Sequence, residues 1–98
     1  MNESSRRDEF VAKLKSQLDE LNRDIDELEA RARKTSGELE KKYQDQLDDV
    51  RARREELKSK IKELRAASEA RIDKLKLEAE HAWKAFNNSV KYFKSHFK

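Results

Sequence analysis

The stretch VAKLKSQLDELNRDIDELEARA (Val11–Ala32) carries an apolar side chain at every third or fourth position. Alternating steps of three and four make a heptad repeat, which places the apolar side chains on one stripe of an α-helix. Such a stripe is buried by packing against another helix rather than inside a thick core. The stretch therefore predicts a helix that associates with a further helix along its length.

The same periodicity extends beyond Ala32, and we name the whole apolar stripe the seam. Two extra steps of four, near Tyr43 and near Ser68, interrupt the heptads and relax the left-handed supercoil that heptads impose. The pattern predicts helix from about residue 5 to about residue 95. We expect self-association through these seam residues: Val11, Leu14, Leu18, Leu21, Ile25, Leu28, Leu39, Leu47, Val50, Leu57, Ile61, Leu64, Ile72 and Leu75.

The composition agrees with long helices. Of the 98 residues, 35% are hydrophobic and 46% are charged, whereas a globular domain has about half apolar and about a quarter charged residues. The chain has one glycine and no proline, so it has little of the punctuation that strands and turns need. It has no cysteine, which excludes disulfides, thiolate zinc sites and thiol catalysis.

The sequence therefore predicts an all-α protein, in one of two arrangements. The first is a nearly continuous, self-associating coiled-coil helix, which at about 1.5 Å per residue would be about 140 Å long. The alternative is a helical hairpin or a three-helix, spectrin-like bundle with turns near 34–37 and 66–68. In that alternative, Thr35 and Glu38 would form a capping box. We favour the continuous helix, because the seam passes nearly unbroken through both possible turns.

We treat residues 1–98 as a single helical unit, with a charged coiled-coil region at 5–80 and a basic aromatic tail at 81–98. The tail ends in AWKAFNNSVKYFKSHFK (Ala82–Lys98), which has four lysines and no acid. On a helix its aromatic side chains share one arc and its lysines flank that arc, as in helices that lie on anionic surfaces. The candidate surface-binding residues are Trp83, Phe86, Val90, Phe93, Phe97, Lys84, Lys91, Lys94 and Lys98.

A simpler explanation of the tail is also open, and we favour it. The large aromatic side chains of a helical stripe can fill the end of a bundle, in place of the leucine and isoleucine used earlier in the chain. Core packing is the commoner use of such a stripe. Both explanations hold if the tail exchanges a partner helix for a lipid surface.

Other motifs do not indicate chemistry. Glu78 and His81 have the E-x-x-H spacing of helical metal sites, but on a helix they lie opposite the aromatic arc, and the motif occurs once. Acidic residues flank the RARR stretch (Arg51–Arg54) on both sides, which argues against nucleic acid as a partner. A single glycine cannot form a phosphate-binding loop. The sequence thus predicts no enzyme activity, no catalytic or metal-binding residues, no cofactor and no small-molecule substrate.

The chain resembles a family of small bacterial coiled-coil proteins associated with stress responses, whose biochemical activity is not established. The resemblance rests on DEFVAKLKSQLDELNRDIDELEARA (Asp8–Ala32), YQDQLDDVRARREELKSKIKELRAASE (Tyr43–Glu69) and the tail AWKAFNNSVKYFKSHFK. It implies a bacterial protein with a non-enzymatic role.

Two functions are expected from these features. The first is a structural, homo-oligomeric coiled coil that acts as a stress-associated scaffold or spacer. The second is a peripheral binding module whose tail attaches to an anionic membrane or to an acidic helix of another protein. No stretch approaches the roughly 20 apolar residues of a transmembrane helix, so we predict a cytoplasmic protein, at the membrane periphery under the second hypothesis.

Overall fold

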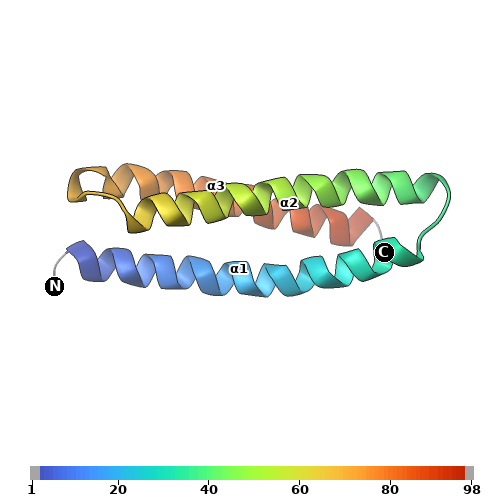
Figure 1. The fold of residues 1–98 in the computed structure, drawn as a ribbon, viewed down its shortest axis with the longest axis horizontal. Helices are drawn as coiled ribbons and strands as arrows, with labels where there is room; N and C mark the ends of the chain where they lie inside the picture. Colours follow the sequence, from blue (N-terminus) through green and yellow to red (C-terminus); the bar gives the residue numbers. More distant parts are fainter. Residues whose placement is uncertain (1–2, 97–98) are drawn as a thin grey trace.

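The computed structural model describes the backbone of residues 3–96 and the side chains of residues 6–96. It contains three α-helices, α1 (Glu3–Lys34), α2 (Glu38–Arg65) and α3 (Glu69–His96), and no strand in the described part of the chain (Figure 1). The prediction of an all-α protein is confirmed.

The helices lie side by side and each packs against the other two. The chain reverses direction twice, so α2 is antiparallel to α1 and α3, which run parallel to each other (Figure 1). The molecule measures 54 × 18 × 17 Å along its principal axes. The beginning of α1 and the end of α3 therefore lie at opposite ends of an elongated body (Figure 1).

The seam residues of the three helices meet in one core along the axis of the body. Of the fourteen seam residues predicted to mediate self-association, all except Leu39 are buried within this single chain. Leu39 is 51% exposed, because it lies in the first turn of α2. The fully buried side chains with the largest volumes are Phe86, Phe93, Ile25, Leu28, Leu47, Leu57, Leu64, Val50 and Val90.

The continuous helix that the sequence favoured is not found. The helix is interrupted at residues 35–37 and 66–68, close to the two positions considered for turns. The physical reason lies in the seam itself. Most helical stability comes from burying an apolar stripe, and folding back lets each stripe find two partner stripes in the same chain.

The first turn differs from the predicted capping box. The Thr35 hydroxyl donates a hydrogen bond back to the carbonyl of Arg31 (2.8 Å), so it serves the end of α1 rather than the start of α2. The residue at the N-cap of α2 is Gly37, with φ 76° and ψ −148°, and no side chain caps the helix there. A positive φ of this kind suits glycine, which has no Cβ. The lone glycine of the chain thus forms the turn.

The second turn is built without glycine. Ala66, Ala67 and Ser68 reverse the chain with negative φ, since only Gly37 has a positive φ among the described residues. The Arg71 N–H donates to the Ser68 carbonyl (2.9 Å), which starts α3. The Arg7 guanidinium donates to the Ala67 carbonyl (3.2 Å). The start of α1 is therefore attached to the turn between the other two helices.

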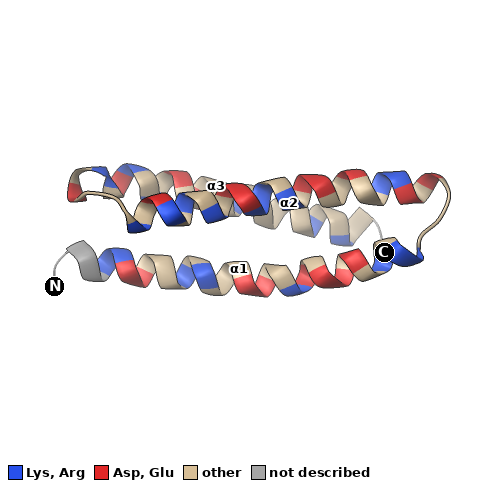
Figure 2. Cartoon of the chain, in the orientation of Figure 1, with Lys and Arg blue, Asp and Glu red and all other residues tan. Residues whose placement is uncertain are grey.

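The outer surface is charged along its whole length. Lys and Arg alternate with Asp and Glu over α1 and α2, whereas the C-terminal part of α3 carries basic residues without acids (Figure 2). Ion pairs cross between all three helices: Arg51–Glu29 (3.3 Å), Lys94–Asp24 (3.1 Å) and Lys60–Glu78 (3.7 Å). These side chains are partly exposed, so each pair contributes little, about 0–1 kcal/mol.

Candidate functional site

The structure divides the predicted surface-binding residues of the tail into two groups. Phe86, Val90 and Phe93 are buried in the core, with at most 1% of each exposed. The Phe93 ring meets Tyr43 of α2 edge to face, with ring centroids 5.1 Å apart. The tail aromatics lie in the bundle because two neighbouring helices are available to cover their arc, which agrees with the core packing that we favoured.

The second group stays at the surface of α3. Lys84, Lys91 and Lys94 are exposed, and Lys94 pairs with Asp24 of α1 at 3.1 Å. Trp83 is half-buried at the edge of the core, facing α1. Phe97 and Lys98 lie outside the described residues.

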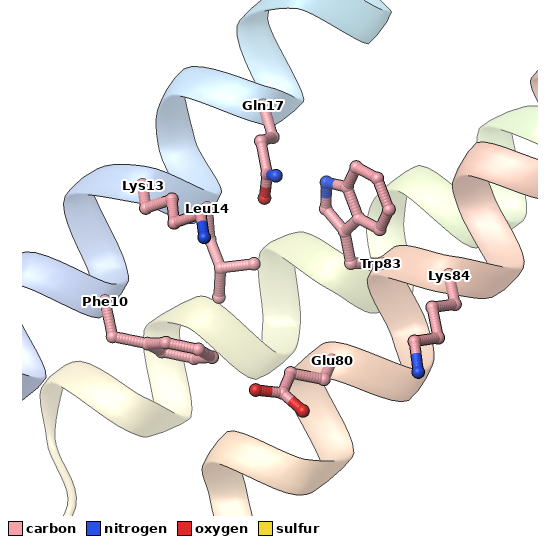
Figure 3. Close-up of a pocket in the computed structure, with 7 residues that line it drawn as sticks. All are labelled: Phe10, Lys13, Leu14, Gln17, Glu80, Trp83 and Lys84. Carbon is pink, nitrogen blue, oxygen red and sulfur yellow. The ribbon is translucent and has the colours of Figure 1, made fainter.

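Trp83 borders a hollow of about 140 Å³ between α1 and α3, which we name the Trp83 hollow. Phe10 and Leu14 of α1 form its other apolar walls, and polar side chains from both helices surround it (Figure 3). Its lining consists of Phe10, Lys13, Leu14, Gln17, Glu80, Trp83 and Lys84.

The charged groups of the hollow are mostly cationic. Lys13 and Lys84 line it, and the Lys76 ammonium lies 5.3 Å from the centroid of the Phe10 ring, within reach of a cation–π interaction. Glu80 is the one carboxylate in the lining. Two lysines and one glutamate thus line the hollow, a third lysine lies against the Phe10 wall, and the local charge is positive.

The indole of Trp83 contributes an unused donor. Its Nε1 atom is buried and has no hydrogen-bond partner among the described residues. In Figure 3 this nitrogen points across the groove toward α1, on the side of Gln17. A buried N–H without an acceptor is rare in folded proteins, so the Trp83 hollow has an unmet requirement for an acceptor.

On each of the two helices, the residues that line this hollow are spaced so that they lie on one side of the helix. Phe10, Lys13, Leu14 and Gln17 follow one another at i, i+3, i+4 and i+7, which is one side of α1. Residues 80, 83 and 84 form the matching side of α3. Trp83 and Lys84 could be predicted from the sequence, whereas the contribution of α1 could not, because only the fold shows that α1 and α3 are neighbours.

The other flank of α3 faces α2 and is closed by a polar contact. The hydroxyl of Ser89, which is 8% exposed, donates to the Asp49 carboxylate at 2.6 Å and accepts from the Gln46 side-chain amide at 3.3 Å. Arg53 pairs with the same carboxylate at 3.6 Å. Ser89 was not among the predicted site residues either, although a serine among Phe86, Val90 and Phe93 marks a polar position at the edge of the arc.

The RARR stretch is occupied by contacts within the bundle. Arg51 pairs with Glu29 of α1 (3.3 Å), and Arg54, at its seam position, donates to the Asn22 amide oxygen (3.4 Å). Glu78 of the E-x-x-H pair lies 3.7 Å from Lys60, and His81 is exposed. Among the side chains of residues 6–96, no three His, Asp or Glu groups lie together so that they could hold a metal ion.

None of the helices described between residues 3 and 96 is both long and apolar enough to cross a membrane. Comparisons with protein-family models, with curated proteins and with solved structures found nothing that matches this chain.

Proposed function

We propose that this protein is a non-enzymatic structural and binding module, a folded-back three-helix bundle that acts as a scaffold or spacer. The observation that carries the proposal is the burial of the seam within one chain. Once the seam is covered, what is left outside is a charged body 54 Å long with a hollow walled by Phe10 and Trp83. Such a surface suits spacing and docking.

The same burial supports a monomer as the working unit. A second copy is needed in a coiled coil because a single stripe has no partner. Here thirteen of the fourteen seam residues are already buried within the same chain, and twelve of them belong to one apolar cluster. Self-association through the seam would require the bundle to open at one of its turns.

The dimensions of the Trp83 hollow favour docking over catalysis. Ligand pockets occupy about 300–1,000 Å³ and enclose most of their ligand, whereas this hollow has about 140 Å³. It is large enough for one apolar side chain. A rigid bundle that receives single side chains from partners is a binding module rather than an enzyme.

Sedimentation equilibrium at micromolar concentration tests the proposal. A monomeric module has the mass of one chain, 11.7 kDa. A stable species of twice that mass or more, with high helix content, would contradict the monomer and support the self-associating coil.

A distance measurement separates the bundle from the continuous helix. Because the chain has no cysteine, the variant Ser36→Cys, Ser95→Cys can be spin-labelled at two defined positions. In the bundle both positions lie at the same end of the molecule, so we expect a separation comparable with its 18 Å width. In one continuous helix the same positions would be about 90 Å apart, and that result would overturn the bundle.

A further inference from the structure

The two flanks of α3 border hollows of opposite character. The hollow beside Ser89, between α2 and α3, is lined mainly by polar side chains such as Gln46 and Asp49, together with Ala85 and Tyr92. Ser89, Asp49 and Gln46 are hydrogen-bonded to one another. The Trp83 hollow, between α1 and α3, has aromatic walls, an unused donor and excess positive charge. Only the second one has properties that another molecule would complement.

We infer that the groove between α1 and α3 binds an acidic amphipathic helix of a partner protein. The partner inserts one apolar side chain into the Trp83 hollow and places carboxylates beside Lys13 and Lys84. This inference rests on the proposed function, because the groove exists only when the bundle is folded.

The size of the hollow determines the group that enters it. A cavity of about 150 Å³ lined by apolar side chains accommodates a benzene ring, and the Trp83 hollow has about 140 Å³. One phenylalanine or leucine side chain fits this space, with Phe10 and Trp83 as its walls. Helix-in-groove recognition works through single anchors of this kind.

The charges around the hollow determine the character of the flanking residues. Lys13 and Lys84 line the hollow together with the single carboxylate of Glu80, and Lys76 lies against the Phe10 ring. Further along the same flank of α3 comes Lys91, and the sequence has no acid after Glu80. A helix with Glu or Asp on both sides of its anchor would meet ammonium groups on α1 and on α3. A basic helix would be repelled.

The Trp83 N–H determines the type of polar contact. A partner helix uses its own backbone carbonyls internally, so the acceptor for this donor must come from a side chain. Because the Nε1 atom is buried in the free protein, the indole has to turn toward the groove before a glutamate or aspartate one turn from the anchor can accept from it. A hydrogen bond to a charged acceptor is stronger than one to a neutral acceptor. The unused donor and the excess of lysines thus favour the same acidic partner.

The structure also favours a helix over an anionic membrane as the partner. Attachment to a membrane requires an exposed apolar face, but Phe86, Val90 and Phe93 lie in the core. They could reach a lipid surface only if α3 left the bundle. A groove with a hollow for one side chain needs no unfolding.

Three synthetic 21-residue helical peptides without tryptophan test this inference. The first has glutamates flanking a single phenylalanine anchor, the second replaces this anchor by alanine, and the third replaces the glutamates by lysines. Binding is measured by the fluorescence anisotropy of labelled peptide, and the emission of Trp83, the only tryptophan, reports occupancy of the hollow. We expect the first peptide to bind most tightly and to shift the Trp83 emission to shorter wavelength.

Charge reversal locates the binding site. The double variant Lys13→Glu, Lys84→Glu should lower the affinity for the acidic peptide by a factor of about ten or more, because attraction is replaced by repulsion at the contact. The matched control is Lys62→Glu, Lys74→Glu, which makes the same charge change at exposed positions of α2 and α3 away from the groove. Equal losses in the two double variants would overturn the inference, because they would show attraction without a site.

The Trp83→Phe variant removes the N–H and keeps an aromatic wall, so it should weaken binding of the acidic peptide several-fold. Unchanged affinity would overturn the role of the indole donor. Equal binding of the alanine-anchored or lysine-rich peptide would overturn the docking inference. Binding to phosphatidylglycerol vesicles without binding to the acidic peptide would also overturn the docking inference. Sedimentation and the spin-label distance are measured without peptide, so failure of the bundle is distinguishable from failure of docking.

Discussion

The two flanks of α3 differ in how the polar groups at the edge of the core are satisfied. Toward α2, the Ser89 hydroxyl bonds both Asp49 and Gln46, so the buried polar group on this side has partners. Toward α1, the Trp83 indole and the adjacent lysines leave a hollow, and a buried donor has no acceptor. One helix can therefore complete a core on one side and present an incomplete surface on the other.

This difference explains the composition of the tail. The aromatic residues between the flanks, Phe86 and Phe93, belong to the core, so they say nothing about a partner. The lysines lie at the surface, and the tail itself has no carboxylate side chain with which they could pair. The aromatic and basic characters of the tail have separate causes, although the sequence presents them as one amphipathic helix.

The largest expected effect concerns the core that the two flanks share. Phe86 is fully buried, and the change Phe86→Ala should lower the free energy of unfolding by about 3–5 kcal/mol. Small domains have about 5–15 kcal/mol in total, so the variant should unfold at much lower urea concentration in circular dichroism. Leu77→Ala, at a side chain that is 60% exposed, is the control. Similar losses in both variants would place Phe86 outside the core.

An intermediate effect is expected on the flank toward α2. Ser89→Ala removes the donor to Asp49, and a hydrogen bond to a charged group contributes about 1.5–3 kcal/mol. Partial exposure of Asp49 and its pairing with Arg53 reduce this, so we expect a loss of about 1 kcal/mol. Ser95→Ala is the matched control, because Ser95 is exposed and its hydroxyl bonds only neighbouring residues of its own helix. If the two serine variants unfold at the same urea concentration, the polar contact does not stabilise this flank.

The smallest effect is expected on the flank toward α1, for the pair Lys94–Asp24. The two side chains are 47% and 28% exposed, and ion pairs at the surface contribute about 0.2–1 kcal/mol. A double-mutant cycle with Lys94→Met and Asp24→Asn should give a coupling energy in this range. The coupling should decrease as salt is raised to about 1 M, where the Debye length is about 3 Å. A coupling that salt leaves unchanged would mean that the pair is more enclosed than the structure describes.

The seam could be predicted almost completely from the sequence, whereas turns near 34–37 and 66–68 were an alternative to the favoured continuous helix. Steps of three and four identified thirteen residues that the structure buries. The same steps run through Ala32, Thr35 and Leu39, although the chain reverses between them. An apolar stripe requires a partner stripe, but its spacing does not say whether that partner lies in the same chain. Gly37 was the available clue, since a lone glycine in a chain of helix formers has a local cost.

The Trp83 hollow could be predicted only in part. The sequence identified Trp83 and the tail lysines as unusual, because aromatics and unopposed positive charge are visible in a single segment. Phe10, Lys13 and Gln17 lie about seventy residues earlier, and nothing local relates them to the tail. The resemblance to bacterial stress-associated proteins stays a prediction, because the comparisons with family models and curated proteins found no match.

The odd number of helices has a mechanical consequence. Since α1 begins at one end of the bundle and α3 finishes at the other, tension applied to the two ends of the chain acts parallel to all three helix axes. Such a load shears the helices past one another and strains the seam contacts together, rather than peeling them apart one at a time. A two-helix hairpin, with both ends at the same place, would instead unzip from its open end.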